Sequence, residues 1–288
     1  MARVALGTRV ALEVEEFGSG AAVVLIHGGA MTHRVWEHQA AALMDRYRSV
    51  AVDLRGAGGS DKPPSGYSVD VFAADIAALV EVLELERPVL VGHGLGAHVA
   101  LRLAATRPEL VRALCLAAAS PWFVGDRDAA EGGFPDELWE RMRGDAARNR
   151  AQADLDLIDR EFFHREPGEA LRAWCLQMAW EWPLPVFAQL ASTLRDLDHR
   201  ETLASIALPV LLLHGRHDRK TRFEGAEYLQ QHLPDARLVT LEESAHCPHL
   251  EEPEAFNQAL LAFIDEVTGS TETPGDPTPA TRLHAVRE

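Results

Sequence analysis

The chain has 288 residues, of which 47% are hydrophobic and 25% charged, a composition typical of globular proteins and sufficient for a large buried core. Its formal net charge of −16 argues against a nucleic-acid partner or an anionic membrane surface, because both require a basic face on the protein. Three widely spaced cysteines indicate neither a disulfide framework nor a zinc site, and without an apolar leader or a membrane-spanning run we expect a cytoplasmic protein.

The predicted elements alternate between strands and helices. Residues 3–16 are expected to form an opening hairpin around Gly7 and Thr8. Short apolar runs then predict strands of a parallel sheet covered on both faces, at residues 21–26, 49–54, 88–91, 112–118, 209–213 and 237–241. Apolar residues at helical spacing predict helices at residues 69–85, 95–105, 224–233 and 253–267. This alternation is typical of an α/β fold with a mostly parallel central sheet and helices on both faces.

One segment interrupts the alternation. Residues 121–200 contain helix formers but no strand-like run, so we expect a helical cap inserted into an α/β core made of residues 1–120 and 201–267. The last residues, 268–288, are rich in Pro, Thr and Gly and predict a flexible tail.

The motif richest in chemical information spans residues 89–97, Val-Leu-Val-Gly-His-Gly-Leu-Gly-Ala. A predicted strand ends, a tight turn with flanking glycines follows, and a helix begins, which is the sequence context of a nucleophile elbow. The tip of such an elbow normally carries Ser, Cys or Asp. Here the tip is Gly94, which has no side chain to act as a nucleophile.

Motifs in a fixed order surround this elbow. From residue 3 to residue 267 the chain resembles the α/β-hydrolase superfamily, and within it the cofactor-free haloperoxidase, arylesterase and lactonase group. The resemblance rests on the elbow and on the segments His27-Gly28-Gly29, Asp53-Leu54-Arg55-Gly56-Ala57-Gly58-Gly59-Ser60, His214-Gly215-Arg216-His217-Asp218 and Ser244-Ala245-His246-Cys247-Pro248. The resemblance implies the α/β-hydrolase fold and activity on esters or lactones.

The resemblance also implies roles for matching positions. Asp218 would be the triad acid and His246 the general base, in the chain order nucleophile, acid, histidine. The acid is needed because it holds the imidazole in the correct tautomer and stabilises the imidazolium. The backbone N–H groups of Gly29 and Leu95 would form the oxyanion hole.

Several other residues have simpler interpretations. Trp180 and Trp182, near Pro183, are candidates for the wall of a substrate pocket, as is His27, although His27 more simply shapes the oxyanion loop. His93 and His98 are interpreted as packing residues, and Asp53 with Arg55 as a fold-stabilising pair. We do not expect Cys247 to replace the nucleophile, because adjacent side chains point in different directions and the elbow is elsewhere.

Gly94 leaves three hypotheses open. The first is an ester or lactone hydrolase whose nucleophile has been replaced by glycine, since only this position deviates. The second is an enzyme that uses His246 and Asp218 as a general base on a substrate or on water, in lyase, decarboxylase, cyclase or cofactor-free oxygenase chemistry. The third is a catalytically silent protein that binds a ligand.

The remaining expectations concern what the chain binds. Epoxide hydrolases and haloalkane dehalogenases are disfavoured, because they need an aspartate at the elbow. No cofactor or metal is expected, since the sequence has no P-loop, no metal-ligand cluster and no dinucleotide-binding glycine motif after a strand. We expect a small, largely apolar carbonyl compound as the substrate and leave a homodimer open.

Overall fold

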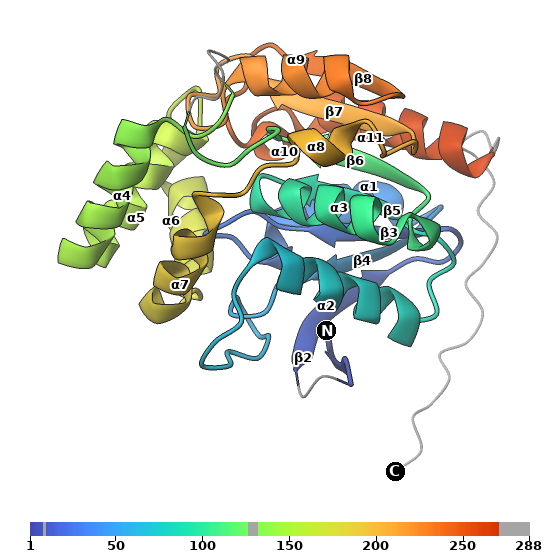
Figure 1. Ribbon diagram of the computed structural model, residues 1–288, viewed down its shortest axis with the longest axis horizontal. Coiled ribbons are helices and arrows are strands. Elements are labelled where there is room, and N and C mark those ends of the chain that lie inside the picture. The colour runs from blue at the N-terminus through green and yellow to red at the C-terminus, as the bar shows by residue number, and fades with distance from the viewer. Residues whose placement is uncertain (8–9, 126–131, 271–288) are drawn as a thin grey trace.

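The computed structural model describes residues 1–7, 10–125 and 132–270 (Figure 1). Within these residues eight strands form one sheet in the order β1-β2-β4-β3-β5-β6-β7-β8. β2 runs antiparallel to its neighbours β1 and β4, and the other pairs are parallel, which confirms the expected mostly parallel α/β sheet. The strands are β1 Ala2–Ala5, β2 Ala11–Phe17, β3 Ala22–Ile26, β4 Arg48–Val52, β5 Val89–His93, β6 Ala113–Ala117, β7 Val210–Gly215 and β8 Ala236–Leu241.

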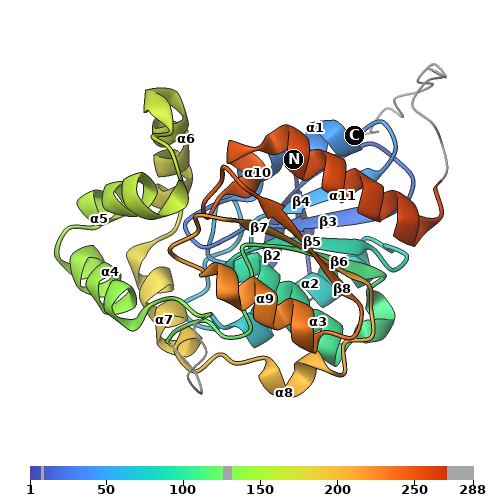
Figure 2. The same ribbon diagram turned by 90° about the horizontal axis from the view of Figure 1, so that it is seen from above.

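Helices cover both faces of this sheet (Figure 2). One face carries α2 Val69–Val82, α3 Leu95–Thr106 and α9 Phe223–His232, and the other carries α1 Glu37–Leu43 and α11 Pro253–Thr268. Shorter helices are η1 His33–Trp36, η2 Pro108–Leu110, α8 Arg200–Leu203 and α10 Pro248–Glu251. Two buried apolar clusters follow from this layering, one on each side of the sheet.

Local sequence explains where the central elements begin and end. All five residues of β3 are buried apolar side chains, as expected for a strand covered on both faces. Helix α2 begins after Ser68, whose hydroxyl accepts a hydrogen bond from the Val71 N–H at 3.3 Å. Helix α11 ends at Gly269, which takes the left-handed conformation with φ +71°.

A second group of helices lies beside the sheet and comes from the segment between β6 and β7 (Figures 1 and 2). The group comprises α4 Asp136–Arg148, α5 Arg150–Leu157, the π-helical turn η3 Ile158–Phe162, α6 Gly168–Trp180 and α7 Leu184–Leu194. We call α4 to α7 the cap helices. They pack against the loops that follow the carboxyl ends of the parallel strands, where ligands of open α/β sheets bind.

Two sequence expectations fall partly outside the described residues, namely the hairpin turn at residues 8–9 and most of the tail, residues 271–288. Among the described helices, none is both long enough and apolar enough to span a bilayer.

Candidate active site

The loop after β5 makes a sharp strand-to-helix turn at Gly94. Gly94 has φ +50° and ψ −108°, a positive-φ conformation that glycine adopts readily, and α3 begins directly after it. Gly96 must also be glycine, because a Cβ there would lie 2.1 Å from the Ile26 carbonyl oxygen. At Gly94 the space is different. A Cβ there would meet only His246, at 3.5 Å from Nε2, which is an ordinary van der Waals contact.

The structure brings Asp218 and His246 together beside this elbow. Asp218 lies in the loop after β7 and His246 in the loop after β8, and the His246 Nδ1–H donates to Asp218 Oδ2 at 2.9 Å. The backbone N–H groups of Lys220 and Thr221 donate to Asp218 Oδ1 at 2.9 and 2.8 Å. The carboxylate is therefore fixed, and it holds the imidazole with Nε2 facing Gly94.

Burial sets the protonation states of this pair. It raises the pKa of Asp218 to about 6, although the nearby His214 and the backbone donors act in the opposite direction. It lowers the pKa of His246 well below the usual value for histidine, an effect that the nearby Lys220 amine strengthens. At neutral pH the pair therefore consists of a carboxylate and a neutral imidazole, the form able to accept a proton.

Two backbone donors face the same space. Gly29, after β3, and Leu95, at the start of α3, both line the cavity next to Gly94. Within the described part of the chain, neither N–H is hydrogen-bonded to another backbone or side-chain group. Free N–H groups at the start of a helix and in a glycine loop can stabilise a developing negative charge on oxygen.

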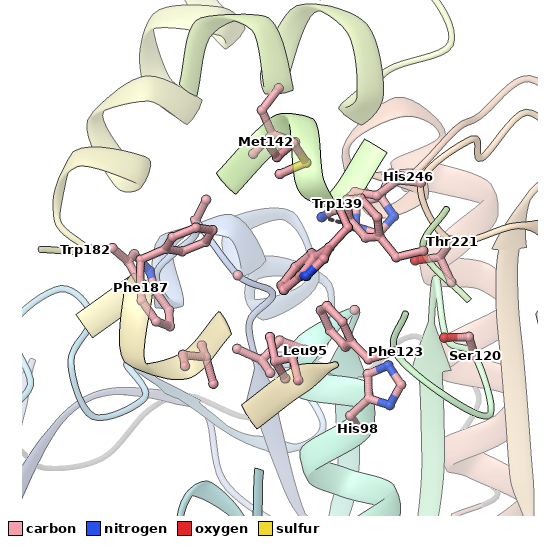
Figure 3. A pocket seen from close by; sticks show the side chains of 18 residues that line it. Leu95, His98, Ser120, Phe123, Trp139, Met142, Trp182, Phe187, Thr221 and His246 are labelled. Atoms are coloured by element: carbon pink, nitrogen blue, oxygen red, sulfur yellow. Dashed lines mark hydrogen bonds between the residues drawn. The ribbon is translucent and has the colours of Figure 1, made fainter. Parts of the chain in front are cut away.

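The cavity above these groups is mainly apolar (Figure 3). Figure 3 shows Trp139 and Met142 of α4 facing Leu95, Phe123 and His98 across it. Its wall is completed by Leu157, Phe187, Leu190 and Leu194 of the cap helices and by Trp182 of the turn between α6 and α7. Such a lining suits a small ligand with an apolar body.

Two expected pocket residues have other positions. The expectation for Trp180 was wrong, because its side chain is 56% exposed and does not line this cavity. His27 does not line it either: its Nε2 accepts from the Leu54 N–H at 3.0 Å and its Nδ1–H donates to the Gly28 carbonyl at 2.8 Å, which holds the loop before Gly29. Trp182 does line the cavity, and its indole N–H donates to the Met31 carbonyl at 2.6 Å.

Lys220 was not singled out from the sequence. Its Nζ lies 3.0 Å from His246 Nε2, at the edge of the cavity. The only sequence signal for it was its place two residues after Asp218, because a residue so close in the same loop can also reach His246. His98, interpreted as a packing residue, stacks on His199 and also forms part of the cavity wall.

Buried groups behind His246 hold its loop. The His93 Nε2–H donates to the His246 carbonyl at 2.7 Å. Cys247 is fully buried, its N–H donates to the Phe162 carbonyl at 3.1 Å, and burial raises the pKa of its thiol. A buried thiol with a raised pKa is a poor nucleophile, so this geometry supports the expectation that Cys247 does not serve as the nucleophile.

Among the described residues, no group of three or more His, Cys, Asp or Glu side chains is arranged to hold a metal ion.

Comparison with known proteins gives consistent matches over most of the chain. Residues 21–253 match the family described as alpha/beta hydrolase fold. The AB hydrolase superfamily protein YisY of Bacillus subtilis is 33% identical over 265 residues, which cover 88% of this chain and 95% of that protein. A non-heme chloroperoxidase of Streptomyces lividans is 32% identical over 254 residues, with coverage of 85% and 92%.

A solved structure agrees. The esterase EaEST from Exiguobacterium antarcticum superimposes with a TM-score of 0.85 at 31% identity, over 89% of this chain and 96% of the esterase.

Proposed function

We propose a function from one premise: this chain belongs to the α/β-hydrolase superfamily, in its haloperoxidase and esterase group, and is a hydrolase-like enzyme. The function we propose is action on a small, largely apolar carbonyl compound, at a site built for ester or lactone hydrolysis. In this site Gly94 stands at the position of the nucleophile.

The observation that carries the proposal is the fit around Gly94. The residue keeps a positive φ, and a Cβ placed on it would lie 3.5 Å from Nε2 and 3.7 Å from Cε1 of His246, with no other residue beyond its chain neighbours within 4 Å. His246 in turn is held by Asp218, and the free N–H groups of Gly29 and Leu95 line the same cavity. The surroundings of a serine nucleophile are therefore complete except for the serine side chain.

Without that side chain, the site can hydrolyse an ester only by another route. His246 can accept a proton from a water in the space above Gly94, while Gly29 and Leu95 stabilise the oxyanion. Loss of the nucleophile from a comparable triad lowers turnover about 10⁶-fold and leaves about 10³–10⁴-fold over the uncatalysed rate. We therefore expect slow hydrolysis at most from the chain with Gly94.

The test is Gly94→Ser on a panel of aryl esters and lactones. We expect an increase in kcat/KM of about 10³ or more, with a burst of product from an acyl-enzyme. Gly94→Ala is the matched control, since it adds the same Cβ without a hydroxyl and should gain nothing. The hydroxyl would compete with Lys220 for His246 Nε2, so Gly94→Ser with Lys220→Met should gain further. No gain in either serine variant would contradict the proposal.

A second candidate is non-hydrolytic, with His246 removing a proton from a C–H or O–H of the substrate. The contact of Lys220 Nζ with His246 Nε2 favours this candidate. It places a second group that can carry a proton next to the base, at a site where residue 94 has no nucleophilic side chain. Base-catalysed exchange of deuterium from solvent into small ketones measures it. The exchange should vanish in His246→Ala, and an unchanged rate in that variant would exclude this candidate.

A further inference from the structure

Lys220 is a polar group of the cavity that the hydrolytic function leaves unused. It lies in the loop after β7, is partly buried, and its amine contacts His246 Nε2 at 3.0 Å. Its amine also lies over the rings of Phe162 and Phe134, at 5.1 and 5.7 Å from the centroids. The amine is therefore held at the catalytic base and among aromatic side chains.

Within the described part of the chain, the Lys220 amine has no anionic partner. Among the described residues, no carboxylate oxygen lies within 4.0 Å of Lys220 Nζ, while most cations of this chain do pair with carboxylates. Burial lowers the pKa of this amine, although Asp218, Cys247 and Glu161 act in the opposite direction. A partly buried amine next to a neutral histidine therefore gives up its proton more readily than an exposed lysine does.

The choice of lysine is itself unusual in this chain. Of its 28 basic residues only Lys62 and Lys220 are lysines, and the others are arginines. An arginine stays charged at any pH that proteins meet, whereas a lysine in an apolar site can lose its proton and become a nucleophile. Position 220, next to His246, therefore carries a basic side chain that can become a neutral, nucleophilic amine.

An amine cannot take over the role of serine toward an ester, because acyl transfer to nitrogen gives a stable amide and ends the cycle. Toward an aldehyde or a ketone the same amine reacts reversibly. We propose that Lys220 is a nucleophilic amine that forms an imine with the carbonyl carbon of a small, apolar aldehyde or ketone bound in this cavity.

The step balances with groups present in the site. The Nζ lone pair forms the C–N bond while the C=O electron pair moves to oxygen, which the N–H groups of Gly29 and Leu95 stabilise. His246 Nε2 accepts a proton from the nitrogen and returns it to the oxygen. The nitrogen gives up both of its protons, the oxygen leaves with them as water, and the C=N bond forms. No oxidant or reductant takes part in this step.

The experiment is reductive trapping in the wild-type protein. Butanal and benzaldehyde are added separately with cyanoborohydride at pH 7.5, and peptide mass spectrometry follows alkylation of Lys220 and Lys62. Lys62 is the internal control, because it is exposed and present in the same molecules. We expect Lys220 to react at least about ten times faster than Lys62, because its amine lies in an apolar cavity that can hold the aldehyde and contacts a base that can take up its proton.

Variants sharpen the result. Lys62→Arg should leave the Lys220 rate unchanged, and His246→Gln should lower it several-fold, with Lys62 labelling as the reference. An unchanged rate in His246→Gln would contradict the proton transfer that the proposal requires. Alkylation of Lys220 no faster than that of Lys62 with both aldehydes would overturn the proposal. The ester assays use Gly94→Ser and this assay uses the wild-type chain, so the two proposals can fail separately.

Discussion

A serine at a nucleophile elbow must both adopt a positive φ and supply the nucleophilic hydroxyl, whereas Gly94 meets only the first requirement. The backbone there holds φ +50°, which glycine adopts freely and a residue with a Cβ adopts at a cost of about 1–3 kcal/mol. The turn thus keeps the backbone geometry of an elbow, which glycine adopts without strain, but it carries no side chain that could act as a nucleophile. Gly94→Ser should accordingly lower the free energy of unfolding even where it raises the hydrolytic rate.

The protonation of Asp218 and His246 gives a prediction for pH. Burial raises the pKa of Asp218 to about 6 and lowers that of His246. As pH falls through about 6, the pair therefore takes up a proton. Whether this proton is on Asp218 or on His246, the pair loses either the carboxylate that orients the imidazole or the free base. We expect kcat/KM of Gly94→Ser to be constant at pH 7–8 and to fall about tenfold per unit well below pH 6.

The control for this profile is Asp218→Asn in the same background. It should be slow throughout and lack the step near pH 6, because the titrating carboxyl is gone. A rate that stays constant down to pH 5 would show that neither group of the pair controls hydrolysis.

At the scale of elements, α10 connects the loop that carries His246 to the segment between η3 and α6. The Glu251 carboxylate, at the end of α10, accepts hydrogen bonds from the Ala245 N–H at 2.7 Å and from the His164 N–H at 2.6 Å. The first donor adjoins His246, and the second lies between η3 and α6. One side chain thus fixes the loop of the base and the end of the π-helical turn.

Glu251→Ala should lower the free energy of unfolding by about 1–3 kcal/mol, because two backbone donors lose their acceptor. Urea denaturation measures it, with Glu254→Ala as the control, since Glu254 is exposed on the adjoining helix α11. Equal stability of the two variants would contradict the role given to Glu251.

Burial raises the pKa of Glu251 from 4.5 to about 7, so the folded state favours the protonated carboxyl. This group therefore makes the wild type less stable as pH rises from about 4.5 to 7. Glu251→Gln does not titrate, so its stability relative to that of the wild type should rise as pH increases over the same range.

Many strands and helices of the fold were predictable from the sequence, for physical reasons. β3, β5 and β7 are continuous apolar runs because both of their faces are covered, and such runs stand out in a sequence. The pair of Asp218 and His246 was predictable because each follows a strand, and carboxyl ends of parallel strands meet at one edge. Lys220 was missed because nothing local shows that its side chain turns toward His246 rather than toward solvent.

At the scale of the whole molecule, the cavity lies between two layers that are far apart in sequence. Its floor comes from the loops after β3, β5, β6, β7 and β8, and much of its roof from the cap helices. Helical spacing in the cap could not show which aromatic residues face the floor, because that depends on how α4 and α6 pack. Trp139 faces it and Trp180 does not, although both are tryptophans of cap helices.

The different positions of Trp139 and Trp180 allow a matched pair of variants to test how the cavity selects substrates by size. Trp139 is 3% exposed and lines the cavity, whereas Trp180 is 56% exposed. In the Gly94→Ser background, Trp139→Ala should shift preference toward longer acyl esters, because each methylene buried in the new space contributes about 0.8 kcal/mol, a factor of about four in kcat/KM. Trp180→Ala should leave the preference unchanged.

Trp139→Phe separates shape from polarity. The Trp139 indole N–H is buried and has no hydrogen-bond acceptor among the described residues, so it is free to donate to a bound substrate. If it does, Trp139→Phe should raise KM for esters while kcat stays nearly constant, since an interaction made equally in the ground state and the transition state is lost. Chain-length profiles of kcat and KM for the three variants distinguish these effects. Identical profiles for Trp139→Ala and Trp180→Ala would mean that the cap does not select the substrate through this cavity.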